Sequence, residues 1–151
     1  MTKHLSAAVR IQKARTALLL DHPFFGSLLF RLGGRPSKSI QTMATDGVSL
    51  YYNPAFVETL NAAELAGVLA HEVMHPALQH HTRRGDRDQK CWNMACDYAI
   101  NPLLLDAGLA MHSCIAARCL LLLPGILSPA ISCGERAKAA YSGRLEQRSD
   151  D

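Results

Sequence analysis

The stretch from Asn61 to His81 reads NAAELAGVLAHEVMHPALQHH, and it decides how the rest of the chain is interpreted. Asn61 followed by Glu64 is a variant of the capping box that begins many helices. Apolar residues then recur at helical spacing and predict a helix with one buried face. These residues are Leu65, Val68, Leu69, Val73 and Leu78. We expect this helix to run to about His81, with Gly85 helping to end it.

The helix carries the motif H-E-x-x-H, in which His71, Glu72 and His75 are the defining residues. Histidines four residues apart lie on one helix face, so both imidazoles can reach one cation. Glu72 lies beside the first histidine and can take a proton from a metal-activated water. Two nitrogens, one further protein ligand and a water molecule suit Zn²⁺. The motif therefore predicts a zinc-dependent hydrolase with Glu72 as general base.

A third protein ligand is needed, and Asp97 is the leading candidate. Asn93, Asp97 and Asn101 are spaced four residues apart and form a polar stripe on an otherwise apolar predicted helix. A carboxylate in apolar surroundings needs a partner, which a metal would supply. Asn93 or Asn101 would then orient the Asp97 carboxylate without binding the metal itself.

His81 and its neighbour His80 are the alternatives for the third ligand. A histidine six residues after the motif serves as a ligand where a glycine bends the helix three residues after the second histidine. That position is Leu78 here, so we expect the helix to continue. A continuous helix would turn His81 away from His75.

The remaining chain predicts helices around a small β-hairpin, an α+β fold. Helices are expected over residues 4–20 and 24–32, a loop over 33–36, strands over 40–44 and 48–52, and a further helix capped by Asp88, bent or restarted at Pro102 and closed by Gly108. Asp46-Gly47 is expected to form a tight primed turn between the strands. Asn53-Pro54 predicts a capped short helix after the hairpin.

Composition limits the class of protein. A chain of 151 residues with 48% hydrophobic and 19% charged residues fits one folded domain. A net charge of +3 is too small to indicate nucleic-acid binding. The five cysteines form no C-x-x-C pair and no signal-peptide core follows Met1, so we expect free thiols and a cytoplasmic protein. The most apolar stretch, residues 119–131, is short and contains two prolines, so we expect no membrane span.

Several short motifs occur together and in order along the chain. They are Ala44-Thr45-Asp46-Gly47, Tyr51-Tyr52-Asn53-Pro54, the H-E-x-x-H helix, His80-His81-x-Arg83-Arg84 and Trp92-Asn93-x-Ala95-x-Asp97-Tyr98-x-Ile100-Asn101. Over about residues 8–109 the chain resembles the bacterial family named "putative metallopeptidase domain", whose members are usually joined to a VWA-like domain. The resemblance implies a zincin-like fold, with a small sheet packed on the metal-binding helix and the following helix. It also implies peptidase activity on peptide or protein substrates, His71, His75 and Asp97 as metal ligands, and a MoxR-type AAA+ ATPase as partner.

The end of the chain departs from this family pattern. We expect a domain over residues 1–110 and an atypical, partly disordered tail over 111–151, with the VWA-like domain absent. Two functions stay open. One is a zinc-dependent peptidase that binds its substrate by strand addition on an edge strand, residues 48–52. The other is a non-catalytic zinc-containing adaptor, which a fourth protein ligand such as His80 would favour.

Overall fold

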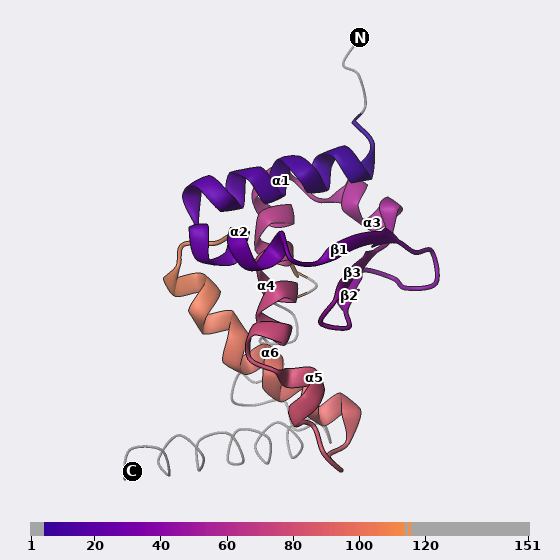
Figure 1. Cartoon of the computed structure of the whole chain (residues 1–151), viewed down its shortest axis with the longest axis vertical. Helices are drawn as coiled ribbons and strands as arrows, with labels where there is room; N and C mark the ends of the chain where they lie inside the picture. The colour runs from indigo at the N-terminus through magenta and orange to yellow at the C-terminus, as the bar shows by residue number, and fades with distance from the viewer. Residues whose placement is uncertain (1–4, 114, 116–151) are drawn as a thin grey trace.

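The computed structural model describes residues 5–113 and residue 115, and these form an α+β fold around one central helix. The elements are α1 (Ala7–Asp21), α2 (Pro23–Leu29), β1 (Gly33–Pro36), β2 (Met43–Thr45), β3 (Ser49–Tyr52), α3 (Pro54–Thr59), α4 (Ala62–Ala77), α5 (His80–Arg83) and α6 (Gln89–Asp106). Helix α4 runs through the middle of the molecule, α1 and α2 cross one end of it, and α6 packs along its other half (Figure 1). The small sheet contacts α4 through β2. The α+β prediction is confirmed.

The capping box that begins α4 is confirmed atom by atom. The Asn61 side chain accepts from the backbone N–H of Glu64, and the Glu64 carboxylate accepts from the backbone N–H of Asn61, both at 2.9 Å. Beyond this cap, Leu65, Val68, Leu69 and Val73 are all buried in the core. Each buried side chain of this size stabilises the fold by about 1.5–3 kcal/mol, so packing fixes the face that α4 turns inward.

The prediction that this helix continues to His81 is wrong. Helix α4 ends at Ala77, Gln79 takes a left-handed conformation with φ 55° and ψ 34°, and α5 starts at His80. Pro76 lies in the last turn and has no N–H to donate to the Glu72 carbonyl, which weakens this turn of the helix. The sequence rule looked for a glycine at position 78, whereas a glutamine one residue later makes the turn.

The expectation of a loop over residues 33–36 is also wrong, because these residues form β1. The sheet has the order β1-β3-β2, with β1 parallel to β3 and β2 antiparallel to it. All four residues of β1 are exposed and two are glycines, so no alternation of apolar residues marks the strand. Pro36 is tolerated because β1 is an edge strand.

The predicted hairpin of residues 40–52 is confirmed as β2 and β3, but its turn is not the primed type. Gly47 has a φ of +90°, whereas Asp46 keeps a negative φ. The Asp46 carboxylate instead holds the turn by accepting from the backbone N–H groups of Ser49 at 2.6 Å and Val48 at 2.9 Å, and from the Tyr51 hydroxyl at 3.0 Å. The hydrogen bonds from Ser49 and then Val48 lower the pKa of Asp46 below its ordinary 3.8.

The strand expected to bind substrate at a sheet edge lies inside the sheet. β3 pairs with β1 on one side and with β2 on the other, so strand addition on residues 48–52 is excluded. The prediction treated the hairpin as the whole sheet and missed β1. The edges of this sheet are β1 and β2.

The N-terminal caps of α3 and α6 form as the sequence predicts. The Asn53 side chain accepts from the N–H of Ala55 at 3.0 Å and caps α3, and Asp88 accepts from the N–H of Cys91 at 3.0 Å and caps α6. A bend or a restart was expected at Pro102; helix α6 continues through this proline to Asp106, so no restart occurs. Gly108 follows with a φ of +76°.

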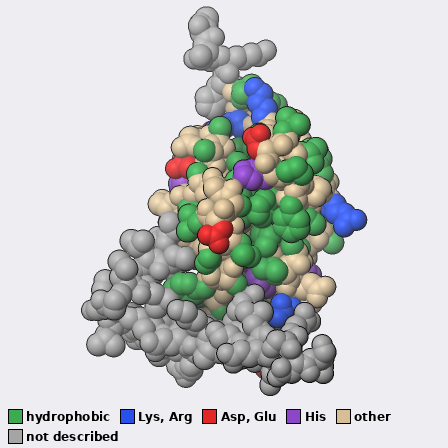
Figure 2. Space-filling view, turned by 90° about the vertical axis from the view of Figure 1, so that its left-hand side faces the viewer, with side chains coloured by type: hydrophobic (Ala, Val, Ile, Leu, Met, Phe, Trp, Pro, Cys, Tyr) green, Lys and Arg blue, Asp and Glu red, His purple; other side chains and the backbone are tan. Residues whose placement is uncertain are grey.

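Part of the apolar surface stays exposed. Figure 2 shows hydrophobic side chains gathered on one face of the molecule. Leu20 of α1 is 75% exposed, and Phe24 of α2 and Leu105 of α6 are more than half exposed.

Across the part of the chain that is described, each helix is too short or too polar to cross a bilayer. The apolar stretch 119–131 and most of the predicted tail lie outside that part.

Candidate metal centre

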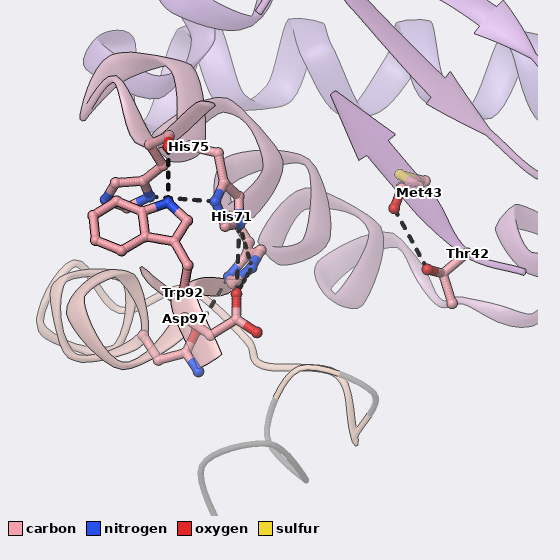
Figure 3. A network of polar contacts seen from close by, with 8 residues as sticks. Thr42, Met43, His71, His75, Trp92 and Asp97 are labelled. Atoms are coloured by element: carbon pink, nitrogen blue, oxygen red, sulfur yellow. Dashed lines mark hydrogen bonds and ion pairs between the residues drawn. The ribbon is translucent and has the colours of Figure 1, made fainter. Parts of the chain in front are cut away.

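Three side chains from two helices converge beside the C-terminal half of α4. His71 and His75 project from α4, and Asp97 projects from α6 (Figure 3). Asp97 Oδ1 lies 3.3 Å from His71 Nε2 and 3.5 Å from His75 Nε2. The two Nε2 atoms lie 3.1 Å apart. We call these residues the His71–His75–Asp97 triad; the structure brings together the three residues that sequence spacing proposed.

The spacing and chemistry of these donor atoms fit a zinc ion. Tetrahedral ligands at about 2.0–2.1 Å from zinc lie about 3.3 Å from one another. The three distances in the triad range from 3.1 to 3.5 Å. Two imidazole nitrogens and a carboxylate oxygen are also a donor set that leaves the fourth zinc position open in catalytic sites. Asp97 is 3% exposed and His71 4%, so a cation here would compensate a buried charge.

Asn101 fixes the orientation of the first histidine. Its Oδ1 accepts from His71 Nδ1 at 3.1 Å, and the side chain is 1% exposed. Because an amide oxygen only accepts, Nδ1 must carry the proton, and the lone pair lies on Nε2 toward Asp97. Of the two residues expected to orient Asp97, Asn101 accepts from His71 and Asn93 is exposed to solvent. Orientation of Asp97 by Asn101 stays a prediction.

Glu72, the expected general base, follows His71 on α4 and is half-buried. One residue along a helix is a rotation of about 100°, so Glu72 lies beside the triad rather than within it. A carboxylate in this position can approach a group bound at the open side of the triad without competing as a ligand.

His80, one of the alternative ligands, lies at the cluster but on the other side of His75. The break at Gln79 places His80 Nδ1 3.3 Å from His75 Nδ1, the ring nitrogen that does not face Asp97. The backbone carbonyl of His80 accepts from Trp92 Nε1 at 2.8 Å, which ties α5 to α6. His80 is thus fixed in place without joining the triad.

His81, the other alternative, lies apart from the triad. It is exposed, and its imidazole packs against the turn between β2 and β3: a Cβ added to Gly47 would lie 3.1 Å from His81 Nε2. The two neighbouring histidines therefore have different surroundings, which their adjacency in the sequence did not reveal.

Cys96 is a buried residue of the cluster that sequence reasoning missed. Its sulfur lies within 4.8 Å of one nitrogen each of His75 and His80. Burial raises the pKa of the Cys96 thiol to about 12 and lowers the pKa of His80 to about 4. Its position next to Asp97 in the sequence was the feature that could have indicated its place at the site.

The expectation of free thiols is confirmed for Cys96 but not for Cys91. Cys96 is a free thiol, whereas Cys91 is disulfide-bonded.

Comparison with known proteins identifies the family of this chain. A family model described as "Putative metallopeptidase domain" matches residues 6–121. The chain belongs to this family. The metallopeptidase-family match includes both helices that carry the triad, and the family implies a bound metal ion.

Among curated proteins, the chain is similar to an uncharacterized protein from Thermotoga maritima, with 33% identity over 98 residues. The alignment covers 60% of this chain and 25% of that protein, so the chain spans about a quarter of the length of this relative. No solved structure matches, and the zincin-like character of the fold stays a prediction.

Proposed function

We propose that this domain is a zinc-dependent peptidase. The observation that carries the proposal is the convergence of His71 Nε2, His75 Nε2 and Asp97 Oδ1 at 3.1–3.5 Å from one another. Membership of the metallopeptidase family supports the same chemistry. The described residues offer three donors to one point, which favours an open position for substrate and water over a closed structural site.

Each residue of the site would have a separate role in the reaction. A zinc ion held by the triad would supply a Lewis acid that acidifies water and polarises the scissile carbonyl. Glu72 accepts the proton of the attacking water and returns it to the leaving amine. Asn101 keeps the His71 lone pair directed into the triad through its hydrogen bond to Nδ1.

Substrate binding is assigned to the free edge of β2. This strand is an edge of the sheet and packs against α4. The carbonyl of Thr42 accepts from the N–H of Asn53 at 2.9 Å, and antiparallel pairing alternates, so the backbone groups of Met43 and Thr45 face away from β3. An extended peptide can add to these groups as a further strand. Figure 3 shows Met43 at the start of β2 and the preceding residue Thr42, to one side of the helix that carries the histidines.

A Glu72→Gln variant tests the proposal. Loss of a general base lowers turnover by about 10²–10⁴-fold, while zinc content should stay unchanged because Glu72 is not a ligand. The assay is cleavage of a mixed peptide library by zinc-loaded protein, read by mass spectrometry, with Glu58→Gln as control because Glu58 is exposed on α3. Undiminished cleavage by Glu72→Gln would refute the proposed role.

The alternative is a non-catalytic zinc-containing adaptor that works with a MoxR-type AAA+ ATPase and a VWA-like protein. A structural site needs a fourth protein donor. His80 is the described residue nearest to that role, but it contacts Nδ1 of His75 rather than the Nε2 that faces Asp97. Zinc-loaded protein that cleaves no member of the library and binds the ATPase would favour the adaptor.

A further inference from the structure

A second group of metal-binding side chains shares one residue with the triad. His75 and His80 each place one ring nitrogen within 4.8 Å of the other and of Cys96 Sγ. These residues come from three helices, α4, α5 and α6. We call them the His75–His80–Cys96 set. Two imidazoles and a thiol differ from the triad in one respect: a soft sulfur donor replaces the hard carboxylate oxygen.

The set is buried, and one of its members has an unsatisfied polar atom. Cys96 and His80 are each 3% exposed. His80 Nδ1 contacts His75, while its Nε2 is buried and makes no hydrogen bond within the described residues. A buried imidazole nitrogen without a hydrogen-bond partner destabilises the fold. A cation that takes His80 Nε2 as its ligand would satisfy this atom.

We propose that the His75–His80–Cys96 set is a second site for a thiophilic cation such as Cd²⁺ or Cu⁺, and that its occupation competes with metal binding in the triad. Thiolate with imidazole is a donor set that soft cations prefer over carboxylate with imidazole. Binding breaks the S–H bond of Cys96: the sulfur lone pair goes to the cation and the proton goes to solvent. No electron is transferred.

The competition follows from the chemistry of the shared imidazole. A neutral imidazole has one nitrogen with a lone pair and one with a proton. His75 Nε2 faces Asp97 and His71, whereas His75 Nδ1 faces His80. A cation bound through Nδ1 therefore keeps the His75 proton on Nε2 and removes a ligand from the triad. This competition rests on the proposed role of His75 in the triad; the thiolate site itself does not.

Ultraviolet and visible spectroscopy of the metal-free full chain tests both statements. Titration with Cd²⁺ should give the cadmium–thiolate charge-transfer absorption in the wild type. In Cys96→Ser, and equally in His80→Asn, the amount of Cd²⁺ that produces this absorption should be lower by one equivalent. His80→Asn keeps every thiol, so a loss of absorption in this variant identifies His80 as a ligand. His71→Ala and His81→Ala should retain the full band, and circular dichroism spectra would confirm that each variant is folded.

For the competition, protein loaded with one equivalent of Co²⁺ is titrated with Cd²⁺. We expect the visible cobalt bands to fall as the thiolate band rises in the wild type, and to persist in Cys96→Ser. A thiolate band equal in the wild type, Cys96→Ser and His80→Asn would overturn the second site. Cobalt loss that is equal in the wild type and Cys96→Ser would overturn the competition. Neither result depends on peptide cleavage, so failure of the proposed peptidase activity would be seen separately.

Discussion

Replacement of Asn101 by leucine should weaken zinc binding without touching a ligand. Asn101 is 1% exposed and accepts from His71 Nδ1 at 3.1 Å. Leucine has a similar size but no acceptor, so the His71 N–H loses its partner in buried surroundings. The buried donor then costs about 1–3 kcal/mol, and loss of such a partner typically lowers metal affinity by about 10–100-fold.

Zinc affinity would be measured by competition with a chromophoric chelator at fixed pH. We expect the Kd of Asn101→Leu to rise by about 10–100-fold, which is about 1.4–2.7 kcal/mol. Asn93→Leu is the matched control, because Asn93 lies on the same helix and is exposed. A folded Asn101→Leu protein with the zinc Kd of the wild type would refute the argument that this hydrogen bond orients His71.

Three further predictions concern the framework of the site. Gln79→Gly should raise the free energy of unfolding by about 1 kcal/mol, because glycine adopts a left-handed backbone without the steric cost of a side chain. Gln79 has this backbone, with φ 55°. Denaturant unfolding measures the change, and a lower stability of the variant would contradict the prediction. Gly67→Ala should lower the stability by about 1–3 kcal/mol, because an added Cβ would overlap the Ala110 carbonyl oxygen. Gly33→Ala is the control, because the space around Gly33 is open. The lowered pKa of Asp46 means that its stabilising contribution is complete above the unfolded-state value near 3.8 and is lost as the pH falls through the lower folded-state pKa. The stability difference between wild type and Asp46→Ala should therefore shrink only below about pH 3.8, and a difference already lost at neutral pH would be inconsistent with this account.

The sequence was informative wherever local chemistry determines structure. Caps depend on side chains that lie within a few residues of one another, so Asn61, Asn53 and Asp88 could each be assigned in advance. The two histidines of H-E-x-x-H share a face through helix geometry alone. Asp97 could be proposed because a carboxylate on a predicted apolar helix face needs a partner.

The features that sequence reasoning missed depend on contacts between distant segments. β1 exists because its backbone pairs with β3, and its exposed glycine-rich residues carry no pattern. The end of α4 depends on a left-handed glutamine, which no propensity rule selects. His80 and Cys96 come together only because that break and the Trp92 hydrogen bond bring α5 against α6. The second set of donors could therefore be recognised only in three dimensions.

The most direct test of the central claim is a crystal structure of the protein loaded with one equivalent of zinc, with anomalous diffraction measured at the zinc absorption edge. The account predicts one anomalous peak at about 2.0–2.2 Å from His71 Nε2, His75 Nε2 and an Asp97 carboxylate oxygen. A zinc peak that is bound elsewhere and lacks Asp97 as a ligand would contradict it.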